Sequence, residues 1–163
     1  MALPVQSIRA RPEHRDILQT VADLLREGRE PVVRKLLRDA TARPVGPFKD
    51  EASALAFLRD RLVVALKPRA IWQFGSRARG DNDEDSDFDL LVVLADGLPQ
   101  EAYAPNRVAE PVVGCGLGYD IVPCSWSEFL KDHDVPGTLV HRAVTEGKPI
   151  YRDRVLRKAE RAT

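Results

Sequence analysis

Apolar residues recur at helical spacing in the first part of the chain and predict a helical hairpin. Over residues 12–27 they recur at intervals of three and four, and Pro12 suits a first helical turn. Gly28 is a suitable end for this helix, and Pro31 opens a second, shorter amphipathic segment. The two prolines and the glycine within residues 41–48 then predict a linker.

A longer helical pattern and three short apolar runs follow the linker. Leucines recur every three to four residues over residues 50–67, and Pro68 ends this predicted helix. Apolar runs of strand length lie at residues 70–74 and 90–94, and a third, β-branched run follows Tyr119. We therefore expect one long helix and three strands.

The last part of the chain predicts further short elements. Residues 125–128 have the pattern of a capping box, so a helix should start directly after the third strand. Another helix is predicted over residues 136–146, followed by a short edge strand at residues 148–151, where a proline is tolerated. The prolines within residues 100–113 permit only a short or kinked helix between the second and third strands.

The polar residues with the clearest chemical meaning stand at the ends of the first two strands. The first apolar run ends in Gly75 and Ser76, and the second begins with Asp87, Phe88 and Asp89. Because side chains alternate along a strand, the two aspartates project from the same side, with Cα atoms about 6–7 Å apart. Two such carboxylates can share a pair of divalent cations about 3.5–4 Å apart, as in phosphoryl transfer. The glycine-serine turn offers backbone N–H groups and a hydroxyl to phosphate oxygens.

This pattern resembles the DNA polymerase β-like nucleotidyltransferase superfamily, and within it the minimal nucleotidyltransferases (MNT). Their mark is Gly-Ser, ten residues, then Asp-x-Asp, and the chain fits it without a gap across residues 75–89. The resemblance implies an α+β fold, in which helices pack on one face of a small mixed β-sheet. We expect this nucleotidyltransferase domain at residues 49–163, preceded by a helical extension and linker at residues 1–48.

The resemblance also implies the residues of the site. A third carboxylate is expected on a later strand, and Asp120 matches it. The expected catalytic and metal-binding acids are Asp87, Asp89 and Asp120. The expected nucleotide-binding residues are Gly75, Ser76, Arg77 and Arg79. The acids would hold two Mg²⁺ ions, with Mn²⁺ as a substitute. Arg77 and Arg79 have an alternative role, as ion-pair partners of the acidic loop at residues 81–85.

Composition narrows the classes of partner. The chain of 163 residues has 25 basic and 25 acidic residues, so its formal net charge is zero, which argues against a general nucleic-acid binder. DNA binding by the predicted hairpin, through Arg34, Lys35 and Arg38, is therefore less favoured than helix packing. The two cysteines form no C-x-x-C motif. Without a signal-peptide pattern or a membrane-length apolar run, we expect a soluble cytoplasmic protein that binds no membrane.

The resemblance also implies an activity. MNT proteins of this size resemble the antitoxin half of HEPN–MNT toxin–antitoxin pairs, in which the nucleotidyltransferase modifies or sequesters a HEPN ribonuclease. This implies transfer of AMP from ATP to a hydroxyl of a partner protein, expected to be of the HEPN type. Two alternatives stay open: an aminoglycoside-type small-molecule nucleotidyltransferase, which could be an oligomer, and a non-catalytic module that neutralises a partner by binding.

Overall fold

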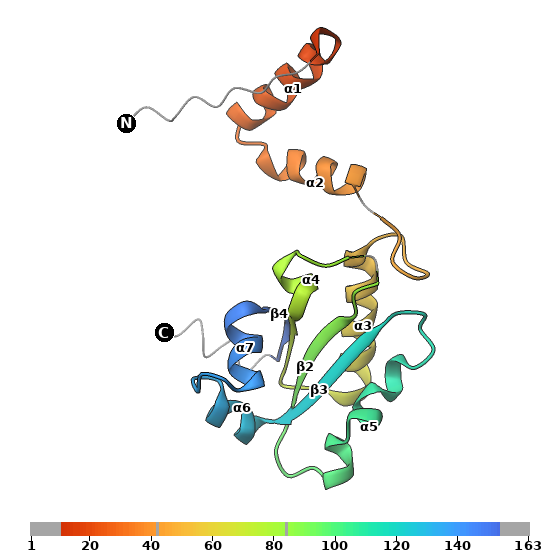
Figure 1. Cartoon of the computed structure of the whole chain (residues 1–163), viewed down its shortest axis with the longest axis vertical. Helices are drawn as coiled ribbons and strands as arrows, with labels where there is room; N and C mark the ends of the chain where they lie inside the picture. Colours follow the sequence, from red (N-terminus) through yellow and green to blue (C-terminus); the bar gives the residue numbers. More distant parts are fainter. Residues whose placement is uncertain (1–10, 42, 84, 154–163) are drawn as a thin grey trace. The chain divides into compact units, whose positions relative to one another are not determined.

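The chain divides into two units, Met1–Ala42 and Arg43–Thr163. A computed structural model describes residues 11–41, 43–83 and 85–153 (Figure 1). The first unit is the predicted helical hairpin, in which α1 (Arg15–Arg26) packs against α2 (Glu30–Thr41). A short 3-10 helix, η1 (Pro12–His14), leads into α1, and Gly28 adopts a positive φ of 72° in the connection.

The second unit contains both helices and strands along its length. Its elements in chain order are α3 (Glu51–Leu66), β1 (Ala70–Phe74), α4 (Gly75–Arg79), β2 (Phe88–Leu94), η2 (Gln100–Tyr103), α5 (Pro105–Ala109), η3 (Glu110–Val112), β3 (Tyr119–Ser125), α6 (Trp126–Asp132), α7 (Leu139–Glu146) and β4 (Lys148–Arg152). The proline-containing segment between β2 and β3 forms only short helical pieces, as predicted.

The strands form one mixed sheet in the order β3-β2-β1-β4. β1 runs antiparallel to both β2 and β4, and β2 runs parallel to β3. The last strand lies at the edge of the sheet, where Pro149 removes no hydrogen bond from a central ladder. The predicted α+β class with a small mixed sheet is confirmed.

Helix ends follow the local chemistry of capping residues. The Asp50 carboxylate accepts a hydrogen bond of 2.7 Å from the Ser53 N–H at the start of α3, and a second capping box at Ser125 starts α6 as predicted. The predicted helix over residues 136–146 begins later, at Leu139. Thr138 caps it, because its hydroxyl accepts a hydrogen bond from the His141 N–H at 3.1 Å.

Helices cover both faces of the sheet, whereas one covered face was expected. On one side α3 and α5 pack against a cluster that includes Leu90, Val92 and Leu94, and on the other side α6 and α7 pack against the cluster of Leu91 and Val93. The physical reason is that β1, apart from Gln73, and most of β2 are apolar at consecutive positions, so both faces need cover. In Figure 1, α3 and α7 accordingly lie on opposite sides of the strands.

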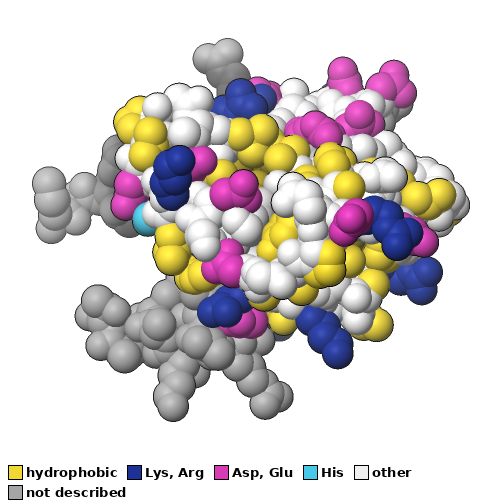
Figure 2. Space-filling view, turned by 90° about the horizontal axis from the view of Figure 1, so that it is seen from below, with side chains coloured by type: hydrophobic (Ala, Val, Ile, Leu, Met, Phe, Trp, Pro, Cys, Tyr) yellow, Lys and Arg dark blue, Asp and Glu magenta, His cyan; other side chains and the backbone are white. Residues whose placement is uncertain are grey.

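The surface has mixed charge, in line with the formal net charge of zero. On the face shown in Figure 2, acidic, basic and apolar side chains are interspersed rather than gathered into one basic area. Within the described ranges, no helix has the length and apolar character needed to cross a membrane.

Candidate active site

The sheet brings the three predicted acids to one end and one face. Asp89 in β2 is the register partner of Asp120 in the parallel strand β3, and Asp87 lies two residues before Asp89. Register partners and residues two apart share a face. Val122 and Leu91 share it too and belong to the cluster under α6 and α7. The three carboxylates therefore project from the face that α6 and α7 cover further along the strands.

Two glycines let the backbone approach these carboxylates closely. A Cβ atom at Gly75, whose φ is 70°, would lie 1.8 Å from Asp89 Oδ2, and a Cβ atom at Gly118 would lie 1.9 Å from Asp87 Oδ1. No side chain larger than hydrogen fits at either position without movement. The Gly75 turn and the Asp89 carboxylate are thus in contact. The sequence spacing does not reveal this role of Gly118, because its contact with Asp87 depends on strand pairing.

The electrostatics of Asp89 reflect this crowding. Burial raises the pKa of the Asp89 carboxyl, and the negative charges of Asp120 and Asp87 raise it further. The positive charges of Arg142 and Arg79 act in the opposite direction and lower the pKa of Asp89. Asp89 is half-buried, whereas Asp87 and Asp120 are exposed. The site therefore concentrates negative charge, which favours a cationic ligand.

The acids suit a hard divalent cation in chemistry. Carboxylate oxygens are the ligands that Mg²⁺ takes together with substrate phosphates, and three carboxylates share this face. Among the residues that the structure describes, no three His, Cys, Asp or Glu side chains are already grouped closely enough to hold a metal ion. Coordination by these acids would therefore require their side chains to turn toward a common ion.

Arg77 is directed into the protein rather than toward the acids. Its side chain is 3% exposed, its Nε donates to the Ser86 carbonyl at 2.8 Å, and its Nη1 lies 3.2 Å from Glu51 Oε2. The guanidinium carbon also lies 4.4 Å from the centroid of the Phe88 ring. These contacts tie the loop before β2 to α3 and favour a structural role for Arg77.

Arg79 and Ser76 lie on α4 at the surface of the site. The Nε of Arg79 is 3.2 Å from Asp81 Oδ2 in the acidic loop, and its Nη1 is 3.6 Å from Glu146 Oε2 on α7. The ion pair with the acidic loop is the alternative that the sequence left open. Ser76 is half-buried and directly follows the turn at Gly75. Its position at the start of α4 keeps it beside the backbone that contacts Asp89.

Arg142 also belongs to the surroundings of the acids, although the sequence did not predict it. It lies on α7, and its charge acts on Asp89 from far along the chain. Only the packing of α7 on the sheet brings them together. A lone arginine in an amphipathic helix gives no signal of this in the sequence.

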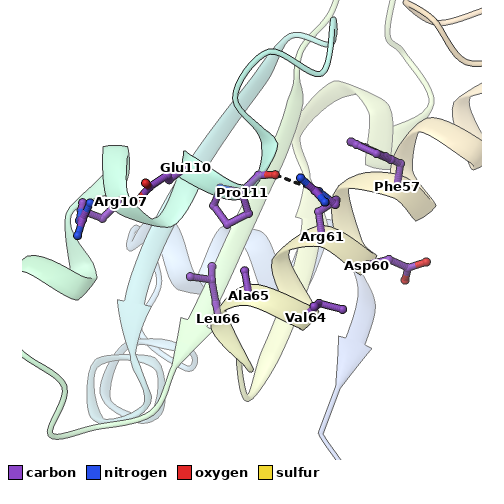
Figure 3. A pocket seen from close by; sticks show the side chains of 9 residues that line it. All are labelled: Phe57, Asp60, Arg61, Val64, Ala65, Leu66, Arg107, Glu110 and Pro111. Atoms are coloured by element: carbon purple, nitrogen blue, oxygen red, sulfur yellow. Dashed lines mark hydrogen bonds and ion pairs between the residues drawn. The ribbon is translucent and has the colours of Figure 1, made fainter.

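A separate cavity of about 620 Å³ lies on the opposite face of the sheet (Figure 3). α3, α5 and η3 supply its walls, with Phe57, Val64 and Pro111 among the apolar residues. The guanidinium of Arg61 donates to the Pro111 carbonyl at 3.2 Å across it. None of the predicted site residues lines this cavity, so it is distinct from the acidic site.

Comparisons with known proteins gave a matching family model and similar solved structures. The model of the nucleotidyltransferase domain family matches residues 55–138, a segment that contains Gly75, Asp87, Asp89 and Asp120. No curated protein matches the chain. Among solved structures, the chain is similar to a mutant of the toxin–antitoxin pair MntA–HpeT, with 22% identity, 68% of this chain and 79% of that chain covered, and a TM-score of 0.41.

A second similar structure is a putative nucleotidyltransferase from Sulfolobus solfataricus. The two chains are 17% identical, the match covers 62% of this chain and 85% of that chain, and the TM-score is 0.40. The family model itself spans more than half of the chain and contains all the predicted site residues. The chain therefore belongs to the nucleotidyltransferase domain family.

Proposed function

We propose that the chain transfers AMP from ATP to a hydroxyl group of a partner protein, as the antitoxin of a HEPN–MNT pair. The observation that carries this proposal is the contact of the Gly75 turn with Asp89, which is itself in register with Asp120. It puts the backbone that we propose binds phosphate next to a set of carboxylates at one end of the sheet. The family supports nucleotidyl transfer as the reaction class.

In this reaction the acceptor hydroxyl attacks the α-phosphorus of ATP and the bond to pyrophosphate breaks. The backbone N–H groups at Gly75 and the hydroxyl of Ser76 would hold the β- and γ-phosphates, so that the leaving pyrophosphate lies in line with the attacking oxygen. Asp120, exposed at the start of β3, would accept the proton of the acceptor hydroxyl. The products are an AMP ester of the acceptor and free pyrophosphate.

Asp87 and Asp89 would hold two Mg²⁺ ions, with Asp120 as a further ligand. Mn²⁺ is expected to substitute. Bound at these acids, the metal ions would neutralise the charge that develops on the phosphate oxygens. The repulsion among the three carboxylates, which contributes to the raised pKa of Asp89, is the observation that fits this assignment.

A protein acceptor is favoured by two features. The formal net charge of zero disfavours a nucleic-acid acceptor, which a basic face would bind. The 620 Å³ cavity lies across the sheet from the acids and cannot hold a small acceptor near them. An exposed hydroxyl on a protein surface, most simply that of a tyrosine, can reach Asp120 without such a pocket.

Label transfer tests this proposal directly. The purified protein is incubated with Mg²⁺, ATP labelled at its α-phosphate and a lysate of its own source, and the label is followed into protein. We expect a partner protein to gain label and the mass of AMP. Asp120→Asn should lose transfer while keeping most of its ATP affinity, because its role is in the transition state. Label found only on an aminoglycoside would replace this proposal by the small-molecule alternative. Neutralisation of a partner without label transfer would favour a binding module.

A further inference from the structure

The polyphosphate of a nucleotide needs positive charge that the predicted arginines do not readily supply. Arg77 is buried and held by Ser86 and Glu51. Arg79 is shared between Asp81 and Glu146. The triphosphate would arrive beside three carboxylates, so a cation within reach would determine how strongly it binds.

Arg142 satisfies this requirement by its position. It lies on α7, next to Ala143, which is buried against the sheet face from which Asp89 projects. Glu146 follows one helical turn later on the same face of α7 and reaches Arg79 on α4. The face of α7 that carries Arg142 is therefore turned toward the helix that starts at Gly75.

The side chain of Arg142 is also available. The residue is exposed, and its guanidinium makes no hydrogen bond or ion pair with the described residues of its own unit, 43–83 and 85–153. Its charge nevertheless acts on Asp89, so it lies within electrostatic range of the acids. A guanidinium presents several N–H donors in a planar fork that matches phosphate oxygens.

We propose that Arg142 binds the β- and γ-phosphates of the bound nucleoside triphosphate from α7, opposite the Gly75 turn. This inference rests on the proposed function and adds a binding residue to it. The nucleotide would then be held from two helices, α4 and α7, that the Arg79–Glu146 ion pair links across the site. Arg142 would discriminate between ATP and AMP, since AMP lacks both phosphates.

The test compares nucleotide binding by wild type, Arg142→Ala and Arg142→Lys with Mg²⁺ present. Affinity for a non-hydrolysable ATP analogue is measured by calorimetry, and affinity for AMP by competition. We expect Arg142→Ala to bind the analogue roughly 10-fold or more weakly, Arg142→Lys to lose less, and AMP to be little affected. Arg107→Ala on α5 is the matched control, because it removes the same charge from another exposed arginine.

Each outcome separates the inference from the proposed function. A loss confined to the ATP analogue in Arg142→Ala, with unchanged thermal melting, supports the inference. Equal affinities of wild type and Arg142→Ala would overturn it, as would an equal loss in Arg107→Ala or an equal loss for AMP. If wild type itself fails to bind the ATP analogue, the proposed function is overturned and the inference with it.

Discussion

At the scale of single residues, Asp89 links the site to the stability of the fold. Its raised pKa means that the folded protein holds the Asp89 proton more tightly than the unfolded chain does. Between the unfolded pKa, about 3.9, and the raised folded pKa, the folded state binds more protons, so stability falls as pH rises through this window. Above the folded pKa, the ionised carboxylate costs stability in the absence of a bound cation.

Asp89→Asn should therefore stabilise the metal-free protein at neutral pH, by roughly 1 kcal/mol, as relaxation of other functional sites does. The gain should be full above the folded pKa and vanish below about pH 3.9, because the wild-type carboxyl is then neutral in both states. Thermal melts in EDTA at pH 7.5 and pH 3.5 measure it. Asp60→Asn is the control, since the hydrogen bond from Arg59 lowers the pKa of Asp60 and the same change there should give no gain. A gain independent of pH would contradict the electrostatic explanation.

Gly75 should be intolerant of any side chain. Gly75→Ala would put a methyl group 1.8 Å from Asp89 Oδ2 in a left-handed conformation. Gly80→Ala is the matched control, because Gly80 has a φ of 84° but no atom within 4 Å of an added Cβ. We expect Gly80→Ala to cost about 1–2 kcal/mol and to keep activity. Gly75→Ala should cost more and lower transfer by about 100-fold, because a shift of about 1 Å in a reacting group has this effect. Equal effects on stability and activity would show that Gly75 does not contact the site.

The residues of the motif could be predicted because they follow a local sequence pattern. Gly75 and Asp89 lie in one strand-loop-strand segment with a fixed spacing, and Asp120 lies inside an apolar run. Arg77 could not be placed, because its inward direction depends on Glu51 and on the loop at Ser86. Arg142 could not be found either, since its relation to Asp89 arises only when α7 packs on the sheet.

At the scale of elements, apolar periodicity and turn chemistry predicted most helices and strands, but not which faces they cover. The predicted strand at residues 70–74 agrees with β1, and the capping box at Ser125 marked the start of α6. Both faces are covered because every residue of β1 is buried. A short apolar run in the sequence does not distinguish such a strand from other buried segments. The start of α7 was missed because Thr138, rather than the earlier proline, supplies the cap.

The cap of α7 offers a test at this scale, since α7 carries Arg142. Thr138→Ala removes the acceptor of the His141 N–H and should cost about 1 kcal/mol in the free energy of unfolding. Thr145→Ala on the same helix is the matched control, because Thr145 only donates back to the carbonyls of His141 and Arg142 from an exposed position. Chemical denaturation of both variants measures the difference. Equal costs would contradict the capping role of Thr138.

At the scale of the whole molecule, sheet topology assembles the site. β1 ends where β2 begins, because the two strands are antiparallel, so the Gly75 turn meets Asp89. β3 runs parallel to β2, so its start brings Asp120 to the same end. The segment of residues 75–89 and the distant Asp120 thus converge at one end of the sheet, while the helical hairpin of residues 15–41 forms a separate unit.

The central claim is that this end of the sheet binds a metal-chelated nucleoside triphosphate. Calorimetric titration of the whole chain with a non-hydrolysable ATP analogue, with and without Mg²⁺, tests it most directly. We predict binding that depends on Mg²⁺ and is lost in Asp87→Asn and Asp89→Asn proteins that remain folded. Equal binding with and without Mg²⁺, or no binding in either condition, would contradict the claim.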